Sequence, residues 1–171
     1  MGMLAQYMAV DNKILNKMLE MDNEKIIDEI EELSEDEKCD ICDIDKMWDG
    51  LHFLLTGKSA ARVIKDSKLS EAVVGTAVFD TEDENEVFLA YIKADELPAI
   101  VNALENIKIK DMIKKYSMDD FKQSQIYPNI WKKEDEADIY DELTFCFEGM
   151  LDFYKKCCKK NMNIVISTRL I

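Results

Sequence analysis

The sequence predicts a mixed α and β protein in which a small sheet packs against helices. Segments with apolar residues at helical spacing alternate along the chain with short runs of β-branched and aromatic residues. No repeat, flexible linker or low-complexity tract interrupts the 171 residues, and hydrophobic residues make up 47% of them. We therefore expect residues 1–171 to form a single α/β domain with an ordinary hydrophobic interior.

The first third of the chain is predicted to contain one strand and three helices. Residues 3–10 form a buried strand, because they are almost all apolar. Asp11 and Asp22 each precede a segment of helical periodicity and can serve as its N-cap. A third helix is predicted over residues 45–56, and Gly57 follows it as a C-terminal cap.

The remaining pattern adds a hairpin, more helices and a closing strand. Residues 73–79 and 87–92 are β-branched or aromatic runs on either side of an acidic turn at 81–85, which is typical of a hairpin. The other predicted elements are a mostly polar loop over 58–70, helices over 97–104, 112–116, 118–124 and 134–160, and a strand over 163–170.

The charge balance limits the partners that this chain can have. There are 36 Asp and Glu residues against 22 Lys and Arg, a formal net charge of -14. Such a chain repels nucleic acid and anionic membrane surfaces, whereas a basic protein partner is compatible with it. No apolar run is long enough to span a bilayer, and no signal peptide is apparent. Five cysteines without a disulfide framework predict reduced thiols and a cytoplasmic location.

Three stretches of the sequence carry a family resemblance. They are the opening Met-Gly-Met, the run Trp-Asp-Gly-Leu-His-Phe-Leu-Leu-Thr-Gly at residues 48–57, and Ile-Tyr-Pro-Asn-Ile-Trp at residues 126–131. With the long helix and the closing strand, they make the whole chain similar to the YfbM-like family of small bacterial proteins. The resemblance implies a three-layer arrangement, a small mixed sheet flanked by helices. It implies no activity and no site residue, because the family has no established function.

The same stretches contain the candidate site. His52 is the only histidine and follows Trp48 by one helical turn. If the Tyr-Pro loop folds over that helix, Tyr127 and Trp131 complete a pocket with them. The alternative is a structural role for all four, with His52 packed on the helix face and bonded to a main-chain carbonyl. Asp49 and the glycine after it are poor helix formers, so we expect this helix to pack loosely.

Cysteine and metal motifs give little support to redox or cofactor chemistry. Cys39 and Cys42 form a C-x-x-C pair inside an acidic connection at residues 34–43. Negative neighbours raise a thiol pKa and oppose its activation. A zinc site would need a second pair at suitable spacing, and neither the calcium-loop pattern nor a phosphate-binding glycine motif is present. The sequence therefore predicts no metal and no cofactor.

These observations leave the function unknown and two interpretations open. The sequence favours a non-catalytic cytoplasmic binding or interaction protein with an acidic surface. The alternative is a small-molecule-binding protein or enzyme with a pocket around Trp48, His52, Tyr127 and Trp131. We assign no catalytic residue, because no nucleophile or second base stands near His52 in the sequence. The oligomeric state also stays open.

Overall fold

A five-stranded sheet lies at the centre of the computed structural model, which describes residues 2–62, 64–79 and 87–170. In these residues the main elements are, in order, β1 (Met3–Val10), α1 (Asn12–Met18), α2 (Asn23–Glu35), β2 (Ile41–Asp45), α3 (Trp48–Thr56), α4 (Lys68–Val74), β3 (Ala77–Val78), β4 (Phe88–Ile92), α5 (Leu97–Glu105), α6 (Ile109–Lys115), α7 (Met118–Gln123), α8 (Glu136–Lys159) and β5 (Asn163–Leu170). Short 3₁₀-helices precede α5 and α8: η1 (Ala94–Glu96) and η2 (Lys133–Asp135).

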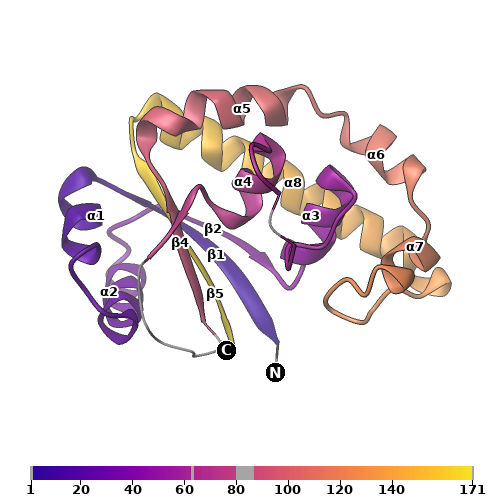
Figure 1. Ribbon diagram of the computed structural model, residues 1–171, viewed down its shortest axis with the longest axis horizontal. Coiled ribbons are helices and arrows are strands. Elements are labelled where there is room, and N and C mark those ends of the chain that lie inside the picture. Colours follow the sequence, from indigo (N-terminus) through magenta and orange to yellow (C-terminus); the bar gives the residue numbers. More distant parts are fainter. Residues whose placement is uncertain (1, 63, 80–86, 171) are drawn as a thin grey trace.

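The first and last strands of the chain pair with each other at the centre of this sheet. The strand order is β2-β1-β5-β4-β3, and β1 pairs with β5 from Met3↔Leu170 to Val10↔Asn163. The two ends of the chain therefore lie side by side (Figure 1). Every strand pairing in the described residues is antiparallel, so the mixed sheet that the family resemblance implied is not observed.

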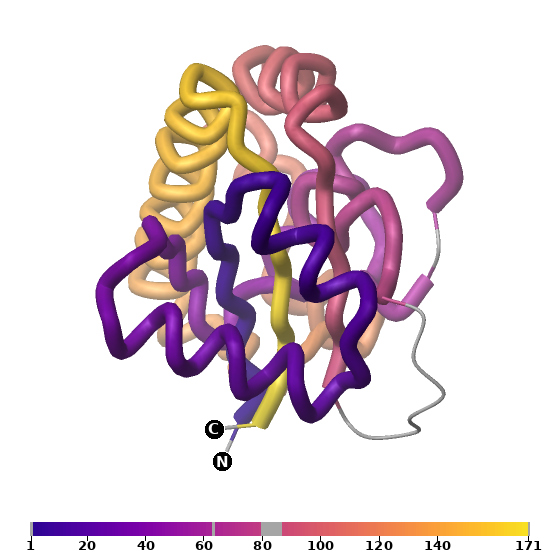
Figure 2. The backbone as a smooth tube through the Cα atoms, turned by 90° about the vertical axis from the view of Figure 1, so that its left-hand side faces the viewer, coloured from indigo at the N-terminus to yellow at the C-terminus, as the bar shows by residue number. Residues whose placement is uncertain are grey.

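The sheet separates two hydrophobic clusters, because successive side chains of a strand point to opposite faces. In β1, Ala5, Tyr7 and Ala9 belong to the larger cluster, and Met8 and Val10 to the smaller one. Helices α1 and α2 contribute to the smaller cluster, and α3 to α8 contribute to the larger one. Figures 1 and 2 show the two groups of helices on opposite sides of the sheet. The predicted three layers are thus present, with the interior divided in two by the sheet.

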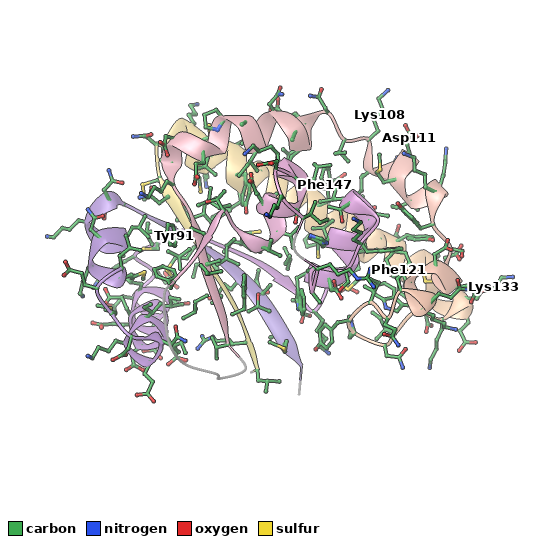
Figure 3. All side chains as sticks on the ribbon, in the orientation of Figure 1. Tyr91, Lys108, Asp111, Phe121, Lys133 and Phe147 are labelled. Carbon is green, nitrogen blue, oxygen red and sulfur yellow. The ribbon has the colours of Figure 1, made fainter. Side chains whose placement is uncertain are left out.

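Side chains from distant helices fill the larger cluster. Phe121 of α7 and Phe147 of α8 belong to it, whereas Tyr91 of β4 packs against the smaller cluster on the opposite face (Figure 3). The hydroxyl of Tyr7 donates to the carbonyl of Val73 at 2.6 Å, and that of Tyr154 donates to the carbonyl of Ala72. These buried bonds fix α4 above the sheet, where it forms part of the site described below.

Local signals in the sequence placed most helix ends correctly. The Asp11 carboxylate accepts from the N–H of Ile14 at 2.8 Å, and Asp22 caps α2 in the same way. Gly57 ends α3 with φ of 77°, a left-handed conformation that favours glycine. The predicted strands over 3–10 and 163–170 are also present with those bounds.

Two predictions about strands are wrong. Residues 73–79 were expected to be one strand, but α4 continues to Val74, and Gly75 then turns the chain with φ of 87°. Only Ala77–Val78 remain as β3, which pairs antiparallel with β4 as a hairpin would, and the predicted turn at 81–85 lies outside the described residues. The acidic connection at 34–43 contains the start of an unpredicted strand, β2, so the third helix begins later than expected, at Trp48.

Candidate functional site

A cavity of about 700 Å³ opens between α4, the loop joining α3 to α4, and the end of the sheet. Its wall is largely apolar and includes side chains from four separate elements: Met3 of β1, Trp48 of α3, Val73 of α4 and Phe88 of β4. The lip carries charged groups from the loop and α4: Arg62, Lys65, Asp66 and Glu71. Apolar walls with a few polar groups at their edge are typical of small-molecule sites.

The Tyr-Pro loop holds Trp48 in the wall of this cavity. The ring of Tyr127 stacks on that of Trp48, with centroids 5.3 Å apart and planes inclined at 24°. The Trp48 indole N–H donates to the Met3 carbonyl at 3.0 Å, and the Met3 N–H donates to the Tyr127 hydroxyl oxygen at 2.7 Å. The loop therefore lies against α3, as the pocket hypothesis requires, and the Trp48 ring is fixed in place before any ligand binds.

Trp131 lies elsewhere. Its side chain is 1% exposed, stacks on Phe121 at 4.3 Å and donates from the indole N–H to the Ile126 carbonyl at 2.7 Å. Of the four predicted pocket residues, Trp48 is among the described residues that line the cavity, whereas His52, Tyr127 and Trp131 are not. The structure thus brings Trp48 and Tyr127 together and assigns Trp131 to the closed interior, which is the structural role considered above.

His52 is fully buried beneath the cavity and is bonded through both ring nitrogens. Nδ1 lies 2.6 Å from the Lys58 carbonyl, which can only accept a hydrogen bond, so Nδ1 carries the proton. Nε2 then accepts from the Ser70 hydroxyl at 2.7 Å. Burial lowers the pKa of His52, although the Lys58 carbonyl and the charge of Asp49 oppose that shift. His52 is therefore neutral at neutral pH.

Ser70 is the polar residue that sequence reasoning missed. It lies in the first turn of α4, is 2% exposed, and belongs to the cavity wall. It is 18 positions away from His52 in the chain, and no spacing rule connects a serine in one helix with a histidine in another. The contact depends on how α3 and α4 pack, which their separate periodicities do not specify.

Asp49 and Gly50 tighten α3, so the prediction of a loosely packed helix is wrong. The Asp49 carboxylate is 3% exposed and accepts from the main-chain N–H groups of Ala60 at 2.7 Å and Tyr127 at 2.8 Å. The Ser59 hydroxyl donates to the same carboxylate at 3.0 Å. One side chain thus ties two loops to the helix, and the absence of a side chain at position 50 leaves room for an indole ring.

The C-x-x-C cysteines pack against the clusters on opposite faces of the sheet. Cys42 packs against the larger cluster and Cys39 against the smaller one. Burial raises the pKa of Cys42 to about 11 with a further contribution from Asp43, and burial also raises the pKa of Cys39. The predicted direction of both shifts is thus confirmed, although burial and not the acidic neighbours is the main cause.

The described ranges contain neither a metal-binding cluster nor a membrane-spanning helix. Within residues 2–62, 64–79 and 87–170, no three or more His, Cys, Asp or Glu side chains are grouped in a way that could hold a metal ion. In the same ranges, none of the helices combines the length and apolar character needed to cross a bilayer.

Comparison with known proteins agrees with the resemblance seen in the sequence. Residues 1–167 match the family described as domain of unknown function DUF1877. Protein YfbM from Escherichia coli (strain K12) is 29% identical over 161 residues, which cover 94% of each chain. The crystal structure of YfbM, a protein of unknown function from Escherichia coli, matches with a TM-score of 0.80 and 27% identity, covering 98% of this chain and 100% of that one. These matches confirm the family resemblance and the mixed α and β fold, and the relatives' descriptions give no activity.

Proposed function

From the premise that this chain belongs to the DUF1877 family, whose function is unknown, we propose that it binds a small, largely apolar molecule in the cavity beside Trp48. The cavity itself carries the proposal. Its volume of about 700 Å³ falls within the usual range for small-molecule sites, roughly 300–1,000 Å³. This function is the small-molecule alternative that the sequence left open, but apart from Trp48 the cavity is lined by residues other than the predicted ones.

Preorganisation supports this proposal. Binding is weakened when side chains must be ordered at the moment of association. Trp48 avoids that cost, because Met3 and Tyr127 hold its ring from two sides without a ligand. The apolar body of a ligand can then lie against the indole face.

Charged groups at the lip favour a ligand with one polar end. Glu71 forms an ion pair with Lys68 at 2.8 Å, so its charge is largely compensated. Arg62 and Lys65 are exposed at the same lip beside Asp66. We therefore propose an apolar molecule whose polar group lies near the mouth, where it keeps contact with water and with these side chains.

A dye titration with a blocked variant tests this function. Anilinonaphthalene sulfonate has an apolar body and one charged end, and we expect the wild type to bind it at one site. Val74→Trp places a large ring in the wall and should weaken binding at least tenfold, about 1.4 kcal/mol. Ile27→Trp is the matched control, because Ile27 is also half-buried but packs on the opposite face of the sheet. Equal binding by both variants, or none by the folded wild type, would refute the proposal.

We also propose a cytoplasmic location. All five cysteines are free, which suits a reducing compartment. Fractionation of cells that produce the tagged chain would test it, and recovery outside the cytoplasmic fraction would count against it.

A basic protein is the second candidate partner, and one observation on α2 favours it. Four acidic residues recur along its exposed face, and in the described ranges none of them belongs to an ion pair: Glu24, Asp28, Glu32 and Glu35. Neutralising these four to Gln or Asn should weaken low-salt binding of a cationic peptide more than neutralising four exposed acids near or along α8, namely Glu134, Asp141, Glu148 and Asp152. Equal losses would show that only net charge matters.

A further inference from the structure

Ser70 and His52 form a bonded pair at the wall of the cavity, and nothing in the proposed binding function requires that pair. The Ser70 hydroxyl lies 2.7 Å from Nε2 of His52, and Nδ1 of the same ring lies 2.6 Å from the Lys58 carbonyl. We propose that Ser70 is a nucleophile, that His52 is its general base, and that the cavity takes an ester or a similarly activated acyl compound. This inference rests on the proposed function, because the acyl group would occupy the same cavity.

The hydrogen bonds give His52 the protonation that such a base needs. An activated serine requires a neutral imidazole whose free lone pair faces the hydroxyl and whose other nitrogen is held by a third group. The Lys58 carbonyl is that third group, and the Thr56 hydroxyl lies 3.3 Å from the same nitrogen. Nε2 is therefore the acceptor and points at the Ser70 hydroxyl.

Burial keeps the base neutral. It lowers the pKa of His52 from the ordinary value of 6.5, which makes the ring a proton acceptor at neutral pH. Asp49, one turn earlier on α3, is the charged group whose field opposes this shift, and its carboxylate is already bonded to Ser59, Ala60 and Tyr127. From α4, the group that meets the ring is the uncharged Ser70 hydroxyl.

The position of Ser70 distinguishes it from a serine that only satisfies a buried histidine. In a closed core such a pair would have packed side chains on every side, but Ser70 belongs to the cavity wall together with Val73, one turn further along α4. Ser67, and not Ser70, caps α4: its hydroxyl accepts from the Ser70 N–H at 3.2 Å. The Ser70 hydroxyl thus does not cap the start of the helix.

The proposed step is acyl transfer to Ser70. The Ser70 oxygen bonds to the acyl carbon, and its proton passes to Nε2 of His52. The bond from the acyl carbon to the leaving oxygen breaks, and that oxygen takes the proton from Nε2. A water molecule then gives a proton to the same nitrogen and its oxygen bonds to the acyl carbon. The bond from that carbon to the Ser70 oxygen breaks, and the Ser70 oxygen takes the proton from Nε2, which releases a carboxylic acid and restores Ser70.

Covalent labelling of the full chain with a fluorophosphonate tests the first half of this step. The Ser70 oxygen would bond to phosphorus, while fluoride leaves and the proton goes to His52. We expect one adduct by intact mass, mapped to Ser70, and none with Ser70→Ala. His52→Gln should label about 100-fold more slowly, because a positioned general base contributes at least that factor to a reaction rate. Ser117→Ala, which removes the capping hydroxyl of α7, a helix with no described residue in the cavity wall, should label as the wild type does.

The pH profile and the dye separate the possible results. If His52 is the base, the labelling rate should fall as the pH drops below 6.5, its ordinary pKa, and should be constant at higher pH. The labelling rate of a lysine or tyrosine would instead keep rising up to a pH of about 10. If His52→Gln fails to fold, Ser70→Ala and the wild-type profile decide. No adduct on protein that binds the dye overturns the nucleophile and leaves the binding function intact. No adduct and no dye binding overturn both, and an adduct elsewhere overturns the nucleophile.

Discussion

The surroundings of the two tryptophans differ more than their local bonds do. Each indole N–H donates to a main-chain carbonyl, that of Met3 for Trp48 and that of Ile126 for Trp131. Each ring also stacks on a neighbouring aromatic ring. Trp131 is nevertheless 1% exposed inside the larger cluster, whereas Trp48 is half-buried and has a cavity beside it.

The difference teaches that the immediate partners of an aromatic ring do not decide its role. Trp131 is closed in because Phe121 stacks on its ring and Gly50 of α3 lies so close that an added Cβ would meet the indole. Among the described residues, Trp48 instead lines the cavity together with the loop from α3 to α4. We therefore expect changes around Trp131 to alter mainly stability, and changes around Trp48 to alter mainly binding.

Trp131→Ala should have the largest effect on stability. Truncating a fully buried tryptophan removes its transfer free energy and leaves a void, which costs about 3–5 kcal/mol. Trp48→Ala should cost less than that and abolish binding of the dye. Urea unfolding gives the first quantity and the dye titration the second. Equal destabilisation by the two substitutions would contradict the contrast drawn between them.

Asp49→Ala should have the second largest effect on stability, because the Asp49 carboxylate connects the loop at the cavity with the Tyr-Pro loop. The change leaves the N–H groups of Ala60 and Tyr127 without their acceptor, at roughly 2–4 kcal/mol in the free energy of unfolding. It also releases the loop that forms the cavity lip, so dye affinity should fall as well. Asp138→Ala, an exposed acid on α8, serves as the control and should lie within about 0.5 kcal/mol of the wild type. A loss no greater than that of the control would show that the carboxylate does not tie the loops.

Two glycine substitutions should shift stability in opposite directions. A Cβ at Gly50 would lie 2.5 Å from the Trp131 ring, so Gly50→Ala should destabilise by about 1–3 kcal/mol. Gly149 is also helical, but in the described part of the chain no atom beyond its own turns of helix lies within 4 Å of the added atom, so Gly149→Ala should stabilise by about 0.5–1 kcal/mol. Thermal unfolding of both variants measures the shifts. A stabilising Gly50→Ala would mean that the Trp131 interior has spare room.

The sequence predicted the framework of the fold better than it predicted the site. Periodicity and capping residues located β1, β5 and most helices, because these signals lie within single segments. Sequence reasoning missed β2, a run of five residues, Ile41–Asp45, that contains two aspartates and lies in an acidic stretch. The same limit applied to the site: whether a tryptophan is closed in, and which residue faces His52, depends on contacts between segments that no local pattern encodes.

The smallest expected effect is the contribution of His52 to the pH dependence of stability, and its size tests whether the cavity stops at Ser70. Its pKa is lowered in the folded state, so the unfolded chain takes up a proton first as pH falls. The stability that this histidine contributes is therefore complete above its ordinary pKa of 6.5 and is lost as pH falls through the folded value. Because it is the only histidine in the chain, the difference between wild type and His52→Gln isolates the effect.

Urea unfolding at a series of pH values would measure this difference. A wild-type stability that declines below the ordinary pKa, while that of His52→Gln stays level over the same interval, would place His52 behind a dry wall formed by Ser70. Parallel curves would instead mean that water reaches the imidazole. The cavity beside Trp48 would then extend past Ser70 to the buried face of α3. It would end nearer to Gly50, and so to Trp131, than the described contacts indicate.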